Sequence, residues 1–251
     1  MPSSTKLESY YQGYWSGDVA TINPSTLRYY LAQSINRVLY LKSKIKLVSG
    51  MKVLDIGAGS GMFLDALNHE GFDIDYIAIE PDLIQSSILL KKNKVQKVFS
   101  KIEHLDKGLK FDLIILSHVL EHVRQPNIFI KKIISMLHPS GVLYVEVPHQ
   151  DHLFKKELEP HILFFNQSSL KVLLSRYGNI LNIECFGKTP KEEIQTFSEG
   201  KFLFVTKLKG KIKSLLSPLL FVKGPKVLIK KLKMGELNPK GTWIRAIINR
   251  P

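Results

Sequence analysis

Val53-Leu-Asp-Ile-Gly-Ala-Gly-Ser-Gly61 runs from an apolar segment into a turn with a glycine at every second position. The apolar residues from Met51 to Ile56 predict a short buried strand, and the apolar spacing after Gly61 predicts a helix. A strand, a glycine turn and a helix bring backbone N–H groups close to a ligand at a helix N-terminus. Glycine suits such a turn because a Cβ would block the approach or forbid the backbone angles.

The spacing of this turn separates it from two common ligand sites. A phosphate-binding loop reads G-x-x-x-x-G-K-[ST], but no lysine follows Gly61, and a dinucleotide fingerprint reads G-x-G-x-x-G. Here the pattern is Asp55-x-Gly57-x-Gly59-x-Gly61. A second acid, Glu80, ends the next apolar segment, where it is placed to accept hydrogen bonds from both hydroxyls of a ribose.

This order of loop and acids resembles the class I S-adenosylmethionine (SAM)-dependent methyltransferases. The resemblance covers residues 10–187 and, more loosely, 242–249. It implies an α/β fold with a Rossmann-like, doubly wound sheet of seven strands in the order 3-2-1-4-5-7-6, strand 7 antiparallel, and an N-terminal helical cap. The alternative is a glycine turn that only packs a helix on a strand.

The chain divides into three predicted segments. Residues 1–48 form an aromatic lid and capping helix, residues 49–187 with 241–251 form the SAM-binding core, and residues 188–240 form a basic insertion between strands 6 and 7. The aromatic cluster around Tyr14 either closes over the cofactor or packs on the core. Asn23 and Pro24 predict the start of the capping helix.

Composition limits the compartment and the partners. The 251 residues contain one cysteine, Cys185, which excludes an intramolecular disulfide and a Cys-rich zinc site and fits a reducing compartment. The polar start lacks an apolar signal segment, so we expect a cytoplasmic protein. Of the net charge of +14, residues 201–240 contribute +10. Their two predicted amphipathic helices either pack as ordinary solvated helices or meet an anionic membrane through residues 205–234.

The cofactor site predicted in this way lies at the carboxyl ends of the strands. The family's adenine lies near the loop of residues 100–104, and Val119-Leu-Glu-His122 resembles a segment of many small-molecule methyltransferases, whose histidine supports the site or touches a ligand. We expect SAM, and its product S-adenosylhomocysteine (SAH), to be bound by Asp55, Gly57, Ala58, Gly59, Gly61, Glu80, Pro81, Ile102, Glu103, Ser117, His118, His122 and Tyr14.

The catalytic residues are expected in the loop after strand 5. A hydroxyl is a poor nucleophile, and histidine is the natural general base near neutral pH. We expect His161 to be the base, oriented by Glu159 or Asp151, with His149 as the alternate. These residues and His152 could also bind a metal ion, but a dense carboxylate cluster is missing from the sequence, so we expect no metal.

Strand 5 is followed by E-x-P, a loop with acids and histidines, His161, the aromatic pair Phe164-Phe165 and a helix that begins near Ser169-Leu170. This order resembles a methyltransferase subfamily common among sugar and glycan modifiers. It implies methyl transfer to a hydroxyl of a sugar, a nucleotide-sugar or a lipid-linked glycan. The high pI raises nucleic-acid methylation as an alternative, but strand 4 ends in Leu-Ser-His-Val instead of an Asn/Asp-Pro-Pro-aromatic tetrad, so we expect no nucleic-acid partner. Methylation of another small molecule and a non-catalytic binding protein also remain open.

Overall fold

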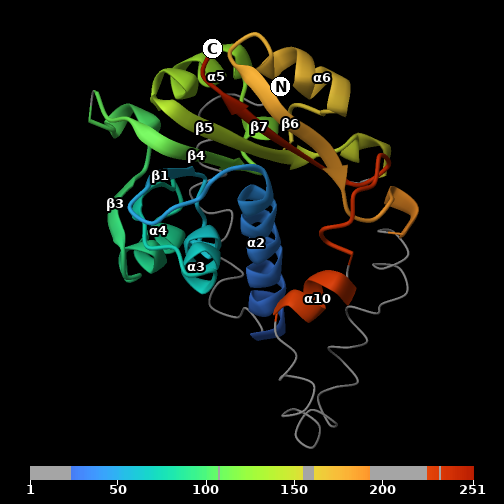
Figure 1. Cartoon of the computed structure of the whole chain (residues 1–251), viewed down its shortest axis with the longest axis horizontal. Helices are drawn as coiled ribbons and strands as arrows, with labels where there is room; N and C mark the ends of the chain where they lie inside the picture. Colours follow the sequence, from blue (N-terminus) through green and yellow to red (C-terminus); the bar gives the residue numbers. More distant parts are fainter. Residues whose placement is uncertain (1–23, 107, 155–160, 193–224, 232) are drawn as a thin grey trace, which may run out of the picture.

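The computed structural model describes residues 24–106, 108–154, 161–192, 225–231 and 233–251. A single seven-stranded sheet forms its centre. The strand order is β3-β2-β1-β4-β5-β7-β6, and β7 runs antiparallel to both of its neighbours (Figure 1). This confirms the predicted sheet. The strands are β1 (Lys52–Ile56), β2 (Asp75–Ile79), β3 (Val95–Phe99), β4 (Phe111–Ser117), β5 (Leu137–Pro148), β6 (Asn179–Phe186) and β7 (Trp243–Asn249).

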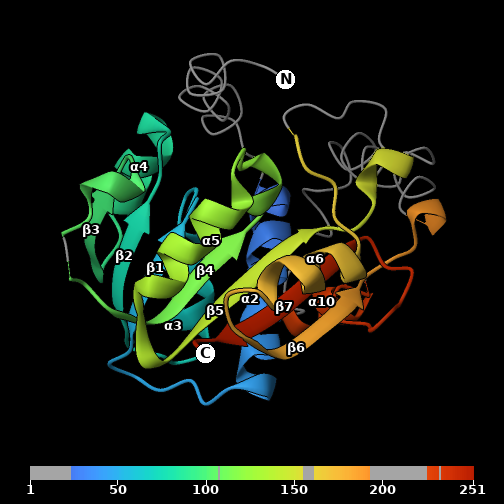
Figure 2. The same ribbon diagram turned by 90° about the horizontal axis from the view of Figure 1, so that it is seen from above.

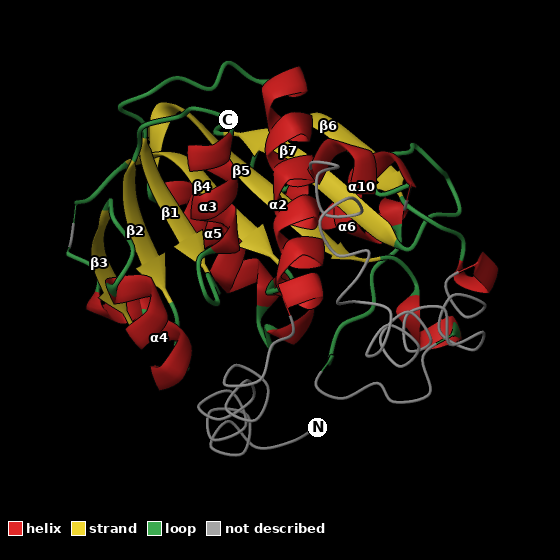
Figure 3. Ribbon diagram, turned by 90° about the horizontal axis from the view of Figure 1, so that it is seen from below, coloured by secondary structure: helices red, strands yellow, loops and turns green. Residues whose placement is uncertain are grey.

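Helices cover both faces of the sheet. One face is packed by α2, α3 and α4, and the other by α5 and α6, as Figures 2 and 3 show from opposite sides. The described helices are α2 (Pro24–Lys44), α3 (Met62–His69), α4 (Leu83–Leu90), α5 (Pro126–Ser135), α6 (Gln167–Leu174) and α10 (Pro225–Lys231). Single 3₁₀ turns are η2 (Ile102–His104), η3 (Leu120–His122) and η4 (Asp151–Leu153).

The central strands are apolar on both sides because both faces are covered. In β1, Val53 packs into the cluster shared with α2 and α3, whereas its neighbour Leu54 packs into the cluster shared with α5 and α6. Both side chains are buried, as are their counterparts in β4. The largely apolar segments that predicted these strands, which Asp55 interrupts in β1, therefore contribute side chains to both halves of the core.

The predicted capping helix is α2, and it begins at Pro24 as expected. Helix α10 lies beside it (Figure 1), and Asn36 in α2 donates a hydrogen bond to the carbonyl of Met234 at 2.8 Å. The lid of residues 1–23 and most of the basic insertion, 193–224, lie outside the described residues, so the three-segment division stays a prediction. No described helix has the length and apolar character needed to span a bilayer.

Two local predictions from the sequence were wrong: that Pro81 begins a helix, and that Pro139-Ser-Gly141 forms a turn. Helix α4 begins at Leu83 and not at Pro81, because the Asp82 side chain caps it by accepting the N–H groups of Ile84 and Gln85, each at 2.9 Å. The expected turn at residues 139–141 is part of β5, which pairs with β4 as far back as Leu137 through a shift in register.

Candidate active site

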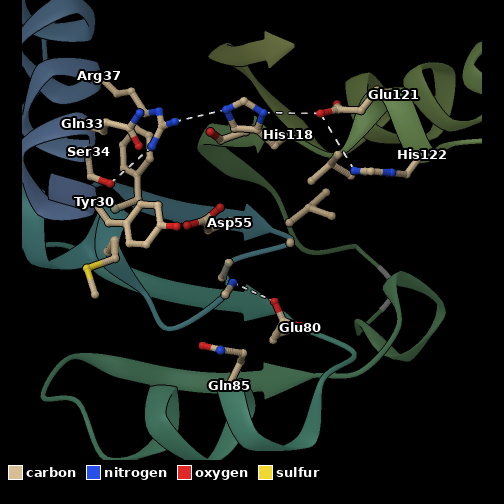
Figure 4. A pocket seen from close by; sticks show the side chains of 18 of the residues that line it. Tyr30, Gln33, Ser34, Arg37, Asp55, Glu80, Gln85, His118, Glu121 and His122 are labelled. Atoms are coloured by element: carbon tan, nitrogen blue, oxygen red, sulfur yellow. Dashed lines mark hydrogen bonds and ion pairs between the residues drawn. The ribbon is translucent and has the colours of Figure 1, made fainter. Parts of the chain in front are cut away.

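The cavity that holds the candidate site lies at the carboxyl ends of β1, β2, β4 and β5, which meet at one edge of the sheet because these strands are parallel. Its volume is about 1230 Å³. Helix α2 forms one wall, through residues that include Tyr30, Gln33 and Arg37 (Figure 4). The cavity therefore combines the strand ends with the helical cap.

The glycine turn presents bare backbone to this cavity. Gly57 and Gly59 have positive φ angles of 70° and 54°, and the Gly57 N–H donates to the Ile79 carbonyl at 2.8 Å. A Cβ on Gly59 would meet no atom within 4 Å, so the open space beside it belongs to the cavity. A ligand can approach the backbone here, which is the contact that SAM requires of this loop.

Glu80 is held rigidly at the end of β2. It is buried, and its two carboxylate oxygens accept the N–H groups of Gly59 at 2.7 Å and Asp82 at 2.8 Å. Each oxygen keeps a second lone pair, which suits the two hydroxyls of a ribose. Burial raises the pKa of Glu80 and these hydrogen bonds oppose the rise. Gln85 lines the same cavity, and its buried Oε1 has no hydrogen-bond partner among the described residues, so it is a further acceptor.

Asp55 lies in β1 beneath the loop and accepts a hydrogen bond from the hydroxyl of Tyr76. Burial raises the pKa of Asp55 to about 7, the Tyr76 hydrogen bond opposes the rise, and the charge of Glu80 adds to it. Burial also raises the pKa of Tyr76 well above its usual value, so Tyr76 stays a proton donor. The pair of Asp55 and Tyr76 beneath the glycine turn is therefore neutral or only partly charged at pH 7.

A buried network of charges joins α2 to the sheet. Glu146 in β5 lies 2.6 Å from Arg37 of α2 and 2.5 Å from Arg245 of β7, and it accepts a hydrogen bond from Tyr144 at 3.0 Å. Burial alone would raise the pKa of Glu146, but the two arginines hold it well below its usual value. Glu146 is therefore an anion that ties three elements together.

His118 lies between two buried carboxylates just after β4. His118 has a positive φ of 59°, and its Nε2 is 3.1 Å from Glu146. Its Nδ1 is 3.4 Å from Glu121 (Figure 4). Burial would lower the pKa of His118, but the two glutamate carboxylates beside it raise this pKa above its usual value. The shift favours the protonated ring, which has no lone pair to accept a proton, so His118 is poorly suited to be a general base. Its ring also meets the edge of Trp243, with centroids 4.7 Å apart.

The histidine that suits a base lies on the other side of Glu121. His161 Nδ1 is 2.6 Å from Oδ2 of Asp151, whose side chain is buried. The chain just after His161 is fixed, because the N–H groups of Ile162 and Leu163 both donate to the Glu121 carbonyl at 3.0 Å. The rings of His161 and His122 lie edge to face, 4.9 Å between centroids.

The structure gathers most of the residues predicted from sequence. Those that line the cavity are Asp55, Gly57, Ala58, Gly59, Glu80, Pro81, Ile102, Ser117, His118, His122, Asp151 and His161. Gly61, Glu103, His149 and His152 do not line it: Glu103, for example, pairs with Lys132 at 2.7 Å on the surface, and the His149 ring contacts the Gly241 carbonyl at 2.7 Å. Tyr14 and Glu159 lie outside the described residues.

Sequence reasoning missed the charged network. Arg37, Glu121, Glu146 and Arg245 were not singled out, although Glu146 and Arg245 carry a recognisable signal, a charge inside an apolar strand pattern. The group of described residues that could bind a metal ion is Glu121, His122 and His161, which shares only His161 with the set considered from sequence.

Comparison with known proteins agrees with this geometry. A family model described as "Methyltransferase domain" matches residues 25–179. The chain belongs to this family of class I SAM-dependent methyltransferases. Membership of this family implies SAM as the cofactor.

Curated relatives match the methyltransferase over part of its length. A ubiquinone biosynthesis O-methyltransferase of Rickettsia typhi is 29% identical over 116 residues, 43% of this chain and 47% of that protein. The corresponding protein of Bradyrhizobium diazoefficiens is 28% identical over 131 residues, 49% of this chain and 50% of that protein. The chain thus matches about half the length of these relatives.

Solved structures show the same fold at low identity. Coclaurine N-methyltransferase bound to N-methylheliamine and SAH has a TM-score of 0.62 at 14% identity, covering 100% of this chain and 90% of that one. Haemonchus contortus phosphoethanolamine N-methyltransferase 2 in complex with SAM has a TM-score of 0.61 at 15% identity, covering 96% and 60%. These likenesses extend to the fold of the methyltransferase and not to its acceptor.

Proposed function

We propose that this protein transfers the methyl group of SAM to a hydroxyl of a small molecule, with His161 as the general base. The observation that carries the proposal is the hydrogen bond between His161 Nδ1 and the buried carboxylate of Asp151, at 2.6 Å. A carboxylate in this position keeps the proton on Nδ1 and leaves the Nε2 lone pair free to accept another.

The residues that line the cavity have separate roles in the proposed reaction. Bound SAM supplies a methyl group on a positively charged sulfonium, which becomes a neutral thioether when the methyl leaves. Glu80 and the backbone at Gly59 hold the cofactor at one end of the cavity, and His161 lines the same cavity. A productive complex needs the acceptor oxygen in line with the methyl group at about 3 Å.

His161 completes the proton balance. As the oxygen–carbon bond forms, the hydroxyl proton passes to Nε2 of His161, and the buried Asp151 stabilises the resulting imidazolium. General-base catalysis of this kind contributes about 10²- to 10⁴-fold in rate. His118 does not compete for this role, because Glu121 and Glu146 raise its pKa.

The lining of the cavity favours an acceptor with an apolar ring. Apolar and aromatic side chains from several elements line the same cavity as His161: Val119, Val123, Phe129, Phe154 and Trp243. We therefore propose a phenolic hydroxyl as the acceptor group. The curated relatives that match this chain are O-methyltransferases by name, which supports oxygen as the acceptor atom.

The sugar or glycan hydroxyl inferred from the sequence stays a prediction with less support than the phenol, as do the nucleic-acid and non-catalytic alternatives. The proposed contact of residues 205–234 with an anionic membrane and the cytoplasmic location are further predictions. Residues 205–224 lie outside the described part of the chain.

The test is a methyl-transfer assay with SAM, following SAH formation with a panel of phenols and monosaccharides. We expect a phenol to be methylated, and His161→Gln to lower kcat by about 10²- to 10⁴-fold while SAH binding, measured by calorimetry, is unchanged. His149→Gln is the matched control, because His149 does not line the cavity. An equal loss of kcat in both variants, or full activity in His161→Gln, would show that His161 is not the general base.

A further inference from the structure

The carboxylate of Glu121 is buried without a hydrogen-bond partner. Its side chain is 1% exposed, and neither oxygen accepts a hydrogen bond from the described residues. Burial of a carboxylate is unfavourable unless a positive charge or a hydrogen-bond donor compensates it. The groups that approach it are imidazole nitrogens: Nδ1 of His118 at 3.4 Å and Nε2 of His122 at 3.9 Å (Figure 4).

His161 completes a set of three ligands around this carboxylate. One ligand atom from each of Glu121, His122 and His161 lies within 4.8 Å of the other two. All three residues line the cavity. We propose that these residues bind a divalent transition-metal cation. Bonds of about 2.1 Å bring ligand atoms to about 3–4 Å from one another, so small side-chain rotations close the site on an ion.

The surroundings of the three ligands are those of a prepared metal site. A ligating histidine usually donates its second ring N–H to a carboxylate, which fixes the orientation of the ring. Asp151 accepts such a bond from His161 at 2.6 Å. The backbone of Glu121 also accepts two N–H groups from the segment after His161, which ties the two ligand-bearing segments together.

The donor set selects the class of ion. Two imidazole nitrogens and one carboxylate oxygen suit Zn²⁺, Fe²⁺, Co²⁺ or Mn²⁺, whereas Mg²⁺ prefers oxygen ligands alone. Three protein ligands also leave coordination positions open towards the cavity, as in catalytic sites. We therefore expect weak Mg²⁺ binding beside clear Zn²⁺ and Co²⁺ binding.

The open coordination positions could bind the acceptor hydroxyl, and this role of the cation rests on the proposed function. A hydroxyl oxygen that coordinates the cation loses its proton more easily, because the cation lowers its pKa. The base role of His161 proposed above belongs to the metal-free protein. In a metal-loaded protein Nε2 of His161 would be a ligand, so the hydroxyl proton would pass to solvent while the oxygen–methyl bond forms and the sulfur–methyl bond breaks.

The test of the site needs no acceptor. The full chain is titrated with Co²⁺, followed by its visible absorption, and with Zn²⁺, followed by calorimetry. We expect one equivalent of each in the wild-type protein, no such binding in Glu121→Gln, and about 10- to 100-fold weaker binding in Asp151→Asn. His69→Ala, which removes an exposed histidine at the end of α3, is the control and should bind as the wild type does.

Two results would overturn the proposal. One is a wild-type protein that binds no stoichiometric Co²⁺ or Zn²⁺, and the other is a Glu121→Gln protein that binds them equally well. Circular dichroism of each variant shows whether it is folded, and His122→Ala provides a second ligand deletion if Glu121→Gln is not. Metal binding without phenol methylation would refute the proposed function alone, and methylation without metal binding would refute the metal site alone.

Discussion

Glu146 in β5 and Arg245 in β7 are paired both in sheet register and through their side chains, whose charged atoms lie 2.5 Å apart in the buried centre of the molecule. Arg37 approaches the same carboxylate from α2, and His118 approaches it from the end of β4. One glutamate therefore links the antiparallel part of the sheet, the helical cap and the wall of the cavity.

Removing one partner of this pair should destabilise the fold. Arg245→Met leaves Glu146 buried with less positive charge around it, and we expect a loss of about 3 kcal/mol in the free energy of unfolding. Urea denaturation measures it. The double variant Glu146→Gln/Arg245→Met should lose less than the sum of the two single variants, because neither member of the Glu146–Arg245 pair is left buried without the other. Lys132→Met, which breaks the exposed pair with Glu103, should change stability by at most about 0.5 kcal/mol.

Asp55 should make the stability of the ligand-free protein depend on pH. Its pKa is raised from 3.8 to about 7 in the folded state. Between these values the folded protein binds more protons at this site than the unfolded chain, so the contribution of Asp55 to stability falls as pH rises. We expect the difference in unfolding free energy between wild type and Asp55→Asn to fall from about pH 4 to 7, by at most about 1.4 kcal/mol per unit. A constant difference would show that Asp55 stays ionised.

Glu80 should determine cofactor affinity. Glu80→Gln keeps the shape of the side chain but removes the charged acceptor, and hydrogen bonds to charged groups contribute about 1.5–3 kcal/mol. We expect SAH binding to weaken by about 10- to 100-fold in calorimetry. Glu103→Gln is the comparison, because its carboxylate lies at the surface beside Lys132. Weaker binding in Glu103→Gln would return that residue to the adenine site predicted from sequence.

The close approach of Gly57 to Val119, which directly precedes η3, should affect the stability of the fold. Gly57→Ala places a Cβ 2.5 Å from Val119, at a positive φ of 70°, whereas Gly50→Ala meets no atom within 4 Å at a φ of 85°. Both variants bear the strain of a left-handed residue, about 1–2 kcal/mol. We expect Gly57→Ala to lose about 1–3 kcal/mol more than Gly50→Ala in thermal or urea unfolding. Equal losses would mean that Val119 moves aside freely.

The sequence predicted the strands well because their signal is local. Apolar runs such as Leu113–Leu116 are buried on both faces, as is typical of a strand covered by helices on both sides. The strand order came from the resemblance and not from the runs themselves. The start of α4 was misplaced because Pro81 and Asp82 are both good signals for a helix start, and only the cap hydrogen bonds distinguish them.

The site was predicted in part, for a reason that its residues make clear. Glu80 and the glycines follow a strict spacing, whereas the partners of Glu121 come from separate segments whose meeting depends on the folded backbone. His161 was singled out with two possible orienting acids, and the structure brings Asp151 to it. Residues that meet from distant segments have no fixed spacing in the sequence, so their contact cannot be predicted from a single sequence.

The position of β7 sets an order for making the protein on the ribosome. Its neighbours β5 and β6 are synthesised earlier but hydrogen-bond to β7 and not to each other, and Thr242 and Trp243 line the cavity. A nascent chain that has reached residue 240 can form the parallel strands and the glycine turn, yet Glu146 still lacks Arg245. The site therefore closes only after β7 has been synthesised, and a chain interrupted before β7 exposes the strand edges of β5 and β6 that would pair with it to chaperones and proteases.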